Sequence, residues 1–586
     1  MVVVTAREKT KQEAVSKNGA SFHGKTLTGA QIFVRSLIDE GVDTIFGYPG
    51  GVVLSIYDEL YKTPELKHIL VRHEQGGAHA ADGYARATGK PGVALVTSGP
   101  GATNAVTGIA TAYMDSVPLV VFTGQVPTFL MGNDAFQEAD TMGITQPITK
   151  HSFLVKNVEE LPEIVHKAFH IAATGRPGPV VVDLPKDMLI SHAPYYPAKN
   201  RDVEIRGYKP IVKGNPRQIK KAAEMIHAAK RPVIYSGGGA VIADAQAELT
   251  AFAHRANIPV TTTLQGLGAF PETDSLSLGM LGMHGTWYAN MSIQEADLII
   301  AIGARFDDRV TGRMADFAPK ATIIHIDIDP TCIGKNVAAD LPIVGDVKEV
   351  LNDLLPLMTP CDTGAWLKMI DKWKKEHPLR FKKSPDVIKP QEVVLALSEL
   401  TKGEALIAVD VGQHQMWAAQ YYKFTQPRSW LSSGGLGTMG YGFPAAMGAK
   451  LACPDRTVIA IVGDGGFQMT AMELATAVNY KIPVKIVIVN NGYLGMVRQW
   501  QQLFFGHRYS HVEMAGSSPD FVKFAESFGA VAYRATTHRE MHSAFEKMMT
   551  ENELPVVVDV RVNKEENCYP MVPAGAALHE MVEEDQ

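Results

Sequence analysis

Residues 458–496 read VIAIVGDGGFQMTAMELATAVNYKIPVKIVIVNNGYLGM, and they carry the clearest signal of the fold. An apolar run at 458–462 leads into a glycine turn, a helix-length segment follows, and a second apolar run ends at Asn490. Strands that are buried on both faces of a parallel sheet read as continuous apolar runs of this kind. The stretch therefore predicts a βαβ unit in which Asp464 and Asn491 follow two neighbouring strands.

Two other parts of the chain repeat this pattern. The apolar run 93–97 is followed by Ser-Gly-Pro-Gly at 98–101, and the run 232–235 is followed by three glycines at 237–239. A proline stands near the start of the next apolar run in all three units, where a strand does not yet need its N–H. We therefore expect an α/β protein with three doubly wound domains, each built around a central parallel sheet.

Two stretches rich in proline and charge, at about 191–218 and 360–392, separate the three units as linkers do. The expected parts are a flexible arm at 1–25, domains at 26–190 and 195–360, a linker at 361–384, a third domain at 385–570 and a tail at 571–586. The tail is acidic, and the sequence leaves open whether it is disordered or forms a lid over a site.

Composition excludes several classes of protein. The 586 residues are 46% hydrophobic and 20% charged, which is typical of a soluble globular protein. The net charge of −6 and the lack of a basic run with interleaved aromatic residues argue against nucleic acid as a partner. We expect no membrane span, because no apolar stretch is long enough to cross a bilayer. We also expect no secretory signal, because the N-terminal residues contain no apolar stretch followed by a cleavage site. Four scattered cysteines without a CxxC pair argue against zinc and disulfide frameworks and favour the cytoplasm.

The strand ends within 458–496 carry the strongest chemical signal. A carboxylate from Asp464 and an amide oxygen from Asn491 are hard oxygen ligands of the kind that Mg²⁺ prefers. They emerge at neighbouring strand ends, which is where open α/β sheets bind ligands. Gly465 and Gly466 let backbone N–H groups approach a phosphate. Because Gly-Asp-Gly is also common in turns, a plain strand-turn-helix is the alternative.

A candidate acid lies in residues 71–86, VRHEQGGAHAADGYAR. Glu74 follows a short apolar run and begins a helix of small residues. A glutamate at the start of a helix usually compensates the helix dipole at the surface. Its position alone therefore assigns Glu74 no chemical role.

Together these features resemble the thiamine diphosphate (ThDP) enzymes. In the resemblance, Asp464, Asn491 and the carbonyl of Tyr493 hold Mg²⁺, and Glu74 hydrogen-bonds N1′ of the aminopyrimidine. Further motifs narrow the resemblance to the catalytic subunits of acetohydroxyacid synthase, also called acetolactate synthase, over about residues 26–575. These motifs are FGYPGG (46–51), SGPGATN (98–104), TGQVP (123–127), DAFQEAD (134–140), GMHGT (282–286), GARFDDRVTG (303–312), GQHQMWAAQ (412–420), GGLGTMGYG (434–442) and GMVRQWQ (495–501).

The resemblance implies an enzyme that decarboxylates pyruvate on ThDP and adds the resulting hydroxyethyl-ThDP carbanion to a second 2-keto acid. Pyruvate as acceptor gives 2-acetolactate and 2-ketobutyrate gives 2-aceto-2-hydroxybutyrate, the first common step towards valine, leucine and isoleucine. The implied catalytic residues are Glu74, Gln125 near the reacting carbons, Met439 under the bent cofactor, Arg309 on the acceptor carboxylate and Trp500 on the extra methyl group of 2-ketobutyrate. Core packing for Met439 and Trp500, and a surface ion pair for Arg309, are the alternatives.

The resemblance also implies which residues surround the cofactors. For ThDP they are Tyr48, Pro49, Pro100, Asn104, Gly412, Gln413, His414, Gly437, Gly465, Gly466 and Met496. This family also binds FAD in its central domain, although the net reaction is not redox. The matching positions are Arg176, Gly237, Gly238, Thr263, Leu264, Met283, His284, Gly303, Arg305, Asp307, Asp327, Ile328 and Asp346. The central unit has three consecutive glycines but lacks the GxGxxG motif that is typical of dinucleotide-binding domains. Without the resemblance, its residues therefore give only weak support for a dinucleotide site.

Active sites of this family lie between subunits, so the resemblance implies a homodimer or tetramer and a separate small regulatory subunit. The enzyme alternatives are an FAD-independent catabolic acetolactate synthase, against which RFDDRVTG argues, and pyruvate oxidase, against which RFDDR and GMVRQWQ argue. A nucleotide-binding protein without activity is the alternative from another class. The joint presence of Glu74, Asp464 and Asn491 argues against it.

Overall fold

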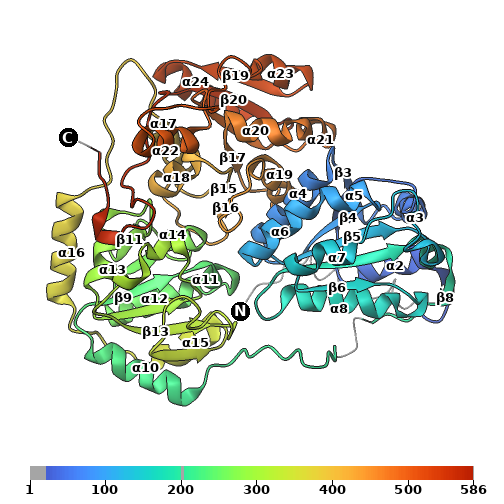
Figure 1. Ribbon diagram of the computed structural model, residues 1–586, viewed down its shortest axis with the longest axis horizontal. Helices are drawn as coiled ribbons and strands as arrows, with labels where there is room; N and C mark the ends of the chain where they lie inside the picture. The colour runs from blue at the N-terminus through green and yellow to red at the C-terminus, as the bar shows by residue number, and fades with distance from the viewer. Residues whose placement is uncertain (1–21, 199–202, 585–586) are drawn as a thin grey trace. The chain divides into compact units, whose positions relative to one another are not determined.

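The computed structural model describes residues 22–198 and 203–584 of the chain (Figure 1). The chain divides into two compact units. The first comprises Met1–Lys209 with the short segments Met447–Ala452 and Ala475–Tyr480, and the second comprises Pro210–Ala446, Cys453–Leu474 and Lys481–Gln586. One six-stranded sheet forms in the amino-terminal part of the chain, and two more form in the central and carboxyl-terminal parts.

The sheet of the first unit is parallel throughout, in the order β3-β2-β4-β5-β7-β6. Its strands are β2 (Thr44–Gly47), β3 (Lys67–Leu70), β4 (Gly92–Val96), β5 (Leu119–Gln125), β6 (His151–Leu154) and β7 (Pro179–Pro185). The helices between them are α2 (Gly29–Asp39), α3 (Leu54–Tyr61), α4 (Glu74–Thr88), α5 (Pro100–Asn104), α6 (Val106–Asp115), α7 (Thr141–Thr145), α8 (Leu161–Ala173) and α9 (Lys186–Ile190). A short antiparallel pair, β1 (Thr26–Thr28) with β8 (His192–Pro194), joins the two ends of this region.

The carboxyl-terminal sheet has the order β16-β15-β17-β18-β20-β19. Counted along the chain, its strands and those of the first sheet both follow the order 2-1-3-4-6-5. The strands are β15 (Leu406–Val409), β16 (Trp430–Ser432), β17 (Val458–Gly463), β18 (Lys485–Asn490), β19 (Val531–Ala535) and β20 (Val556–Arg561). The helices are α17 (Pro390–Thr401), α18 (Gln413–Tyr421), α19 (Gly442–Ala452), α20 (Asp464–Thr470), α21 (Leu474–Asn479), α22 (Gly495–Phe504), α23 (Phe521–Ser527) and α24 (His538–Thr550).

The central sheet has a different topology, β11-β10-β9-β12-β13-β14, which is 3-2-1-4-5-6 in chain order. This is the strand order of the dinucleotide-binding folds. Its strands are β9 (Pro232–Ser236), β10 (Val260–Thr262), β11 (Ser277–Met280), β12 (Leu298–Ile302), β13 (Thr322–Asp327) and β14 (Leu341–Val344). The helices are α10 (Pro216–Ala228), α11 (Gly238–Ile242), α12 (Gln246–Ala256), α13 (Trp287–Glu295), α14 (Asp308–Thr311) and α15 (Val347–Leu354).

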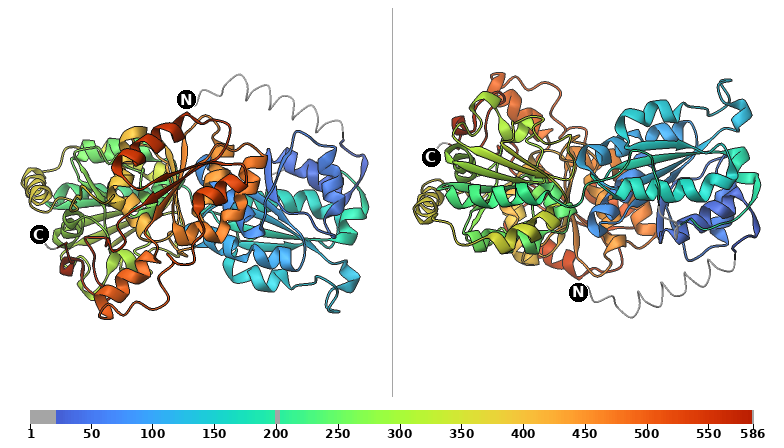
Figure 2. Two further views of the ribbon diagram at one scale, coloured as in Figure 1. Left: turned by 90° about the horizontal axis from the view of Figure 1, so that it is seen from above. Right: turned by 90° about the horizontal axis from the view of Figure 1, so that it is seen from below.

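Burial on both faces explains the continuous apolar runs. Along β12, Ile300 and Ile302 pack into one hydrophobic cluster, whereas Ile299 and Ala301 pack into another on the opposite face. Figures 1 and 2 show helices covering the faces of the sheets. The predicted fold class, three doubly wound α/β domains with parallel sheets, is confirmed.

In each sheet the chain order reverses beside the first strand, between β2 and β4, between β9 and β12, and between β15 and β17. Open α/β sheets bind ligands in the crevice outside the carboxyl ends of the strands at such a switch point. The glycine-containing turns singled out from the sequence follow these strands. Three of the expected cofactor-binding segments therefore lie where the topology favours a ligand.

One segment differs from the sequence expectations, and the packing of another bears on a question that the sequence left open. The expected linker at 361–384 contains a helix, α16 (Gly364–Glu376), whose Trp366 and Ile370 are buried in the core of the central region. The tail is packed rather than free, since Val572 and Leu578 join the same cluster and Met571 pairs with Val582. Most of the expected N-terminal arm lies outside the described residues. No helix within 22–198 or 203–584 is long and apolar enough to cross a membrane.

Candidate active site

Asp464 lies at the switch point of the carboxyl-terminal sheet, directly after β17. Its side chain is buried, with 1% exposure, and its Oδ2 has no hydrogen-bond partner within the described chain. Burial raises the pKa of Asp464 to about 7. A buried carboxylate oxygen without a donor is costly unless a cation compensates it. This environment fits a Mg²⁺ ligand.

Asn491 follows the neighbouring strand β18, and the two consecutive asparagines point to different partners. Asn490 Nδ2 donates to Asp559 Oδ1 at 2.8 Å within the sheet. Asn491 Oδ1 accepts from the Tyr493 N–H at 3.0 Å, and its Nδ2 faces Gln413 Oε1 at 3.4 Å. Asn491 is therefore the one beside the expected diphosphate residues. Among the residues that the structure describes, no three His, Cys, Asp or Glu side chains cluster as a metal site, and the predicted set contains only one such side chain.

The loop after β15 lies on the other side of the switch point. A Cβ on Gly412 or on Gly463 would come within 2.9 Å of the His414 ring, so this ring occupies the space between the two strand ends. Burial lowers the pKa of His414 to about 3, and its buried Nε2 has no partner in the described part of the chain. A neutral imidazole and open backbone turns suit a bound phosphate group.

Asp410 is a residue of this site that the sequence reading missed. It is fully buried and accepts hydrogen bonds from the backbone N–H groups of Val411, Gly440 and Gly442. A Cβ on Gly466 would lie 2.7 Å from Asp410 Oδ1. Asp410 therefore fixes the loop that carries Met439 against the turn that carries Gly466. The Met439 methyl lies beside Gly465, 3.6 Å from where a Cβ on that glycine would be.

In the first unit, Glu74 begins α4 and is buried. Its Oε2 accepts from Asn104 Nδ2 at 3.0 Å, which brings two of the predicted residues together. A Cβ on Gly101 would lie 3.4 Å from the other oxygen, Oε1. The donor that holds the Glu74 carboxylate is thus a neutral amide. The other carboxylate oxygen, Oε1, borders the turn that contains Gly101.

The loops after β2 and β4 meet across the switch point of the first unit. A Cβ on Gly50 would lie 2.4 Å from Thr97, so the segment with Tyr48 and Pro49 packs directly against the start of the segment with Pro100. The buried hydroxyls of Thr97 and Ser98 have no partner among the described residues. Two unpaired donors at strand ends indicate room for a polar ligand.

Gln125 ends β5, and a residue that the sequence did not single out orients it. Its Nε2 donates to Asp183 Oδ2 and to the Ala139 carbonyl, each at 2.9 Å. Asp183 also accepts from Thr123 at 2.7 Å, and burial raises the pKa of Asp183 to about 7. Both amide hydrogens of Gln125 are therefore engaged by the protein.

Arg309 and Trp500 present accessible side chains in the second unit. The Arg309 side chain is 64% exposed and faces the exposed Asp308 at 3.5 Å, a pair too solvated to hold it firmly. Trp500 lies on α22, half-buried, with its ring 5.0 Å from that of Phe504. Met496, on the same helix, packs against the core.

The predicted FAD residues follow the strands of the central sheet, with one exception. The turns after β9 and β12 touch, since a Cβ on Gly237 would lie 2.2 Å from the Gly303 carbonyl oxygen. The buried hydroxyls of Ser236 and Thr262 lack partners in the described chain, which fits a polar ligand at this edge. The side chains of Asp307, Asp346 and Thr263 also cap the helices that follow them. Capping is a structural role that each of these residues has without any ligand. Arg176 is the exception, because it belongs to the first unit and donates to Ser116.

The remaining predicted positions follow this arrangement. Gly238 opens α11 and Leu264 lies in the turn after β10. Asp327 ends β13, and Ile328 follows it. Arg305 lies after β12, and Gly437 has a positive φ of 73° in the loop before Met439.

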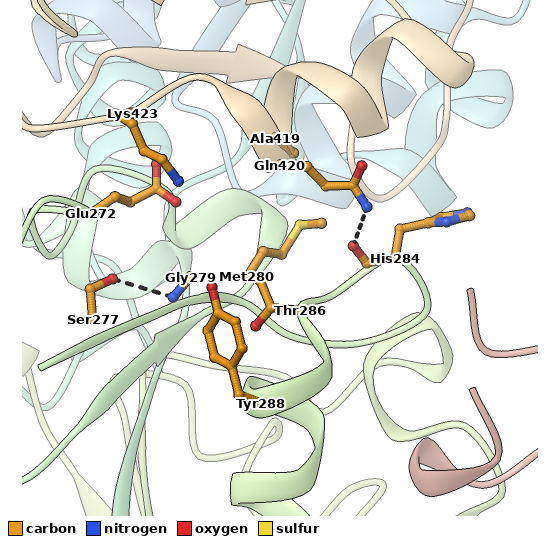
Figure 3. Close-up of a pocket in the computed structure, with 10 residues that line it drawn as sticks. All are labelled: Glu272, Ser277, Gly279, Met280, His284, Thr286, Tyr288, Ala419, Gln420 and Lys423. Carbon is orange, nitrogen blue, oxygen red and sulfur yellow. Dashed lines mark hydrogen bonds between the residues drawn. The ribbon is translucent and has the colours of Figure 1, made fainter. Parts of the chain in front are cut away.

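A separate small cavity lies between the central and carboxyl-terminal parts of the second unit (Figure 3). It measures about 40 Å³, enough for a few water molecules and far too small for a dinucleotide. Glu272 lines it, and burial raises the pKa of Glu272 to about 7. Gln420 Nε2 donates to the His284 carbonyl at 2.9 Å beside it, which links α18 to a predicted FAD segment.

Comparison with known protein families gives three matches along the chain. Residues 27–144 match the thiamine pyrophosphate enzyme N-terminal TPP binding domain, and residues 219–354 match the thiamine pyrophosphate enzyme central domain. Residues 410–560 match the thiamine pyrophosphate enzyme C-terminal TPP binding domain. The first two matches each contain both strands of a switch point described above, and the third begins directly after β15 and contains β17.

Comparison with curated proteins gives relatives over nearly the whole chain. The acetolactate synthase large subunit of Haemophilus influenzae is 52% identical over 564 residues, covering 95% of this chain and 98% of the relative. The acetolactate synthase isozyme 3 large subunit of Escherichia coli is 51% identical, with the same two coverages. The acetolactate synthase large subunit of Corynebacterium glutamicum is 49% identical over 98% of this chain and 93% of the relative.

Proposed function

The chain belongs to the acetolactate synthase large-subunit family of thiamine pyrophosphate enzymes, and we propose that it condenses pyruvate with a second 2-keto acid. The acceptor is pyruvate or 2-ketobutyrate, and the products are 2-acetolactate or 2-aceto-2-hydroxybutyrate. The observation that carries the proposal is the switch point of the carboxyl-terminal sheet. There a buried Asp464 with an unpaired oxygen, Asn491 and two glycines provide what Mg²⁺ and a diphosphate require.

The residues of this switch point have separate tasks. Asp464, Asn491 and the Tyr493 carbonyl would hold Mg²⁺, while Gln413, His414 and the glycine turns would bind the diphosphate. When bound, ThDP supplies an electron sink for loss of CO₂ from a 2-keto acid. Asp410 holds the loop of Met439 in place against Gly465, and Met439 would there support the bound cofactor.

Glu74 is proposed to hold a proton at Oε1, the oxygen that borders the Gly101 turn. Its other oxygen accepts from Asn104 Nδ2, a neutral donor that orients the carboxyl group. Such a group can exchange a proton with a ring nitrogen. Glu74 and Asp464 belong to different units of the chain, and we propose that two subunits complete each active site, as the family resemblance implies.

The acceptor acid is proposed to be recognised by Arg309 and Trp500. An exposed guanidinium whose only described carboxylate neighbour is itself exposed can form a bidentate pair with a substrate carboxylate. An indole next to the acceptor methyl would discriminate between pyruvate and 2-ketobutyrate, since one methylene in an apolar pocket contributes roughly 10–200-fold.

FAD is proposed to bind at the switch point between β9 and β12. The 3-2-1-4-5-6 strand order, the touching glycine turns and the unpaired hydroxyls of Ser236 and Thr262 support it. The RFDDRVTG motif favours this type over a catabolic, FAD-independent enzyme. Since the relatives are named large subunits, we also propose a separate small regulatory subunit as partner. The four scattered cysteines, none of them in a CxxC pair, support the proposal of a cytoplasmic location.

Product analysis tests the proposal. Purified protein with ThDP, Mg²⁺, FAD and pyruvate should form acetolactate, and added 2-ketobutyrate should divert the product to acetohydroxybutyrate. Reduction of FAD by pyruvate at the turnover rate, without a condensation product, would instead indicate a pyruvate oxidase.

A further inference from the structure

The inward face of α22 is fastened to the segment that follows β20. Arg498 and Gln499 are fully buried, although both are polar. Arg498 Nη2 donates to the Glu566 carbonyl at 2.7 Å and to Asn567 Oδ1 at 2.8 Å. Because these two residues face inward, Trp500 and its neighbour Val497 are left on the accessible side of the helix.

Gln499 makes the most complete set of these bonds. Its Oε1 accepts from the Cys568 N–H at 2.9 Å and from Gln413 Nε2 at 2.8 Å. Its Nε2 donates to the Cys568 carbonyl at 3.3 Å and to Met571 Sδ at 3.4 Å. One buried amide thus joins α22, the start of α18 and residues 567–578, which we call the C-terminal strap.

The other end of the C-terminal strap is fastened to the turn that carries Arg309. The Val572 N–H donates to the Met283 carbonyl at 2.8 Å, and the Met283 N–H donates to the Arg309 carbonyl at 2.7 Å. Further along, the Arg313 N–H donates to the Ala576 carbonyl at 2.9 Å and Arg313 Nε donates to the Gly575 carbonyl at 3.1 Å. The backbone around Arg309 therefore rests on the strap.

We propose that Gln499 is a positioning residue for substrate selection, which acts by clamping the C-terminal strap between the Trp500 helix and the Arg309 turn. The residue touches no reacting atom. Through the strap, Gln499 fixes the distance between Trp500 and Arg309, the two side chains that are proposed to bind the acceptor acid. These side chains lie at opposite ends of the strap. This inference rests on the proposed function, because it takes the roles of Arg309 and Trp500 from it.

The test compares three variants with the wild-type enzyme at saturating ThDP, Mg²⁺ and FAD. Gln499→Met keeps an unbranched apolar stem of similar length and removes all four bonds of the amide. Arg313→Gln removes the guanidinium bond to the Gly575 carbonyl at the other end of the strap, at a half-exposed position. Gln391→Met is the matched control, because this buried glutamine of the same unit donates to the Glu566 side chain and contacts neither α22 nor the strap in the described bonds.

Two measurements are made on each protein. One is the ratio of acetohydroxybutyrate to acetolactate from an equimolar mixture of pyruvate and 2-ketobutyrate. The other is the hydrogen-exchange protection of residues 567–578, which needs no activity. We expect Gln499→Met to lower the ratio at least threefold and protection at least tenfold, Arg313→Gln to shift both in the same direction by less, and Gln391→Met to change neither.

Two results would overturn the inference. One is a folded Gln499→Met or Arg313→Gln enzyme whose strap has lost hydrogen-exchange protection but whose product ratio stays within 1.5-fold of wild type. The other is a Gln391→Met enzyme whose product ratio and protection shift as much as those of Gln499→Met. If Gln499→Met does not fold, the product ratio and strap protection of Arg313→Gln decide whether the inference holds. If the wild-type enzyme forms no condensation product, the proposed function fails, and the loss of protection in Gln499→Met still shows whether the residue clamps the strap.

Discussion

Asp464 allows a test in which a structural role and a ligand-binding role predict opposite results. In the metal-free protein, burial raises its pKa from 3.8 to about 7. An acid whose folded pKa lies above its unfolded value binds its proton more tightly in the folded state. The free energy of unfolding therefore falls as the pH rises from about 4 to about 7 and then stays level. The shift of about three pKa units corresponds to at most about 4 kcal/mol, at about 1.4 kcal/mol for each unit.

Asp464→Asn removes this charge and keeps the shape of the side chain. We expect the metal-free variant to be more stable than wild type by about 1–3 kcal/mol at pH 8, because an unpaired amide recovers only part of the cost. Near pH 4 the difference should vanish. With Mg²⁺ and ThDP at about 1,000 times their Kd, wild type gains about 4.1 kcal/mol and the variant gains nothing, so the order of stability inverts.

Urea unfolding after dialysis against EDTA, repeated with Mg²⁺ and ThDP, measures both effects. Asp559→Asn is the matched control, since Asp559 is also fully buried in this sheet but accepts from Asn490 at 2.8 Å and pairs with Arg534 at 3.2 Å. It should lose stability with and without cofactor. If Asp464→Asn is less stable than wild type at pH 8 without metal, or is stabilised equally by Mg²⁺ and ThDP, our account of Asp464 is wrong.

Three further substitutions test other parts of the site. Glu74→Gln should keep the hydrogen bond from Asn104 and the circular dichroism spectrum but lower kcat by about 10²–10⁴-fold, and turnover near that of wild type would remove Glu74 from the mechanism. Trp500→Leu should retain acetolactate formation and lose the preference for 2-ketobutyrate; an unchanged product ratio would contradict its role. Gly466→Ala places a Cβ 2.7 Å from Asp410 Oδ1, so it should cost about 1–3 kcal/mol in urea unfolding and weaken ThDP binding, whereas Gly516→Ala, with open space around its Cβ, should do neither.

The apolar runs and glycine turns predicted the fold class because burial on both faces of a parallel sheet leaves a mark in the sequence. The order of the strands within each sheet could not be predicted in this way. The turns after β9 and β17 look alike in sequence, yet the central sheet follows 3-2-1-4-5-6 and the other two follow 2-1-3-4-6-5. Order depends on which strands pair, and pairing is set by helix crossovers and packing that a local pattern does not report.

The same limit explains which site residues were found. Asp464 and Asn491 stand at strand ends, so a local pattern places them. Asp183 and Gln499 act through partners distant in sequence, Gln125 for the first and Cys568 for the second. Asp410 had a local signal that could have revealed it, because it directly follows the apolar run 406–409 and stands two residues before Gly412. The helix α16 was missed because the stretch around it is rich in proline and charge, although Trp366 and Ile370 lie four residues apart, as on one face of a helix.

The central claim is that this chain is a ThDP-dependent condensing enzyme, and product analysis tests it most directly. Protein stripped of cofactors would be given pyruvate and 2-ketobutyrate with ThDP and Mg²⁺, in the presence and absence of FAD. We predict acetohydroxybutyrate in excess over acetolactate, with activity that requires both ThDP and FAD. Acetolactate alone, formed equally well without FAD, would contradict the assignment of the central sheet, and no condensation product at all would contradict the account as a whole.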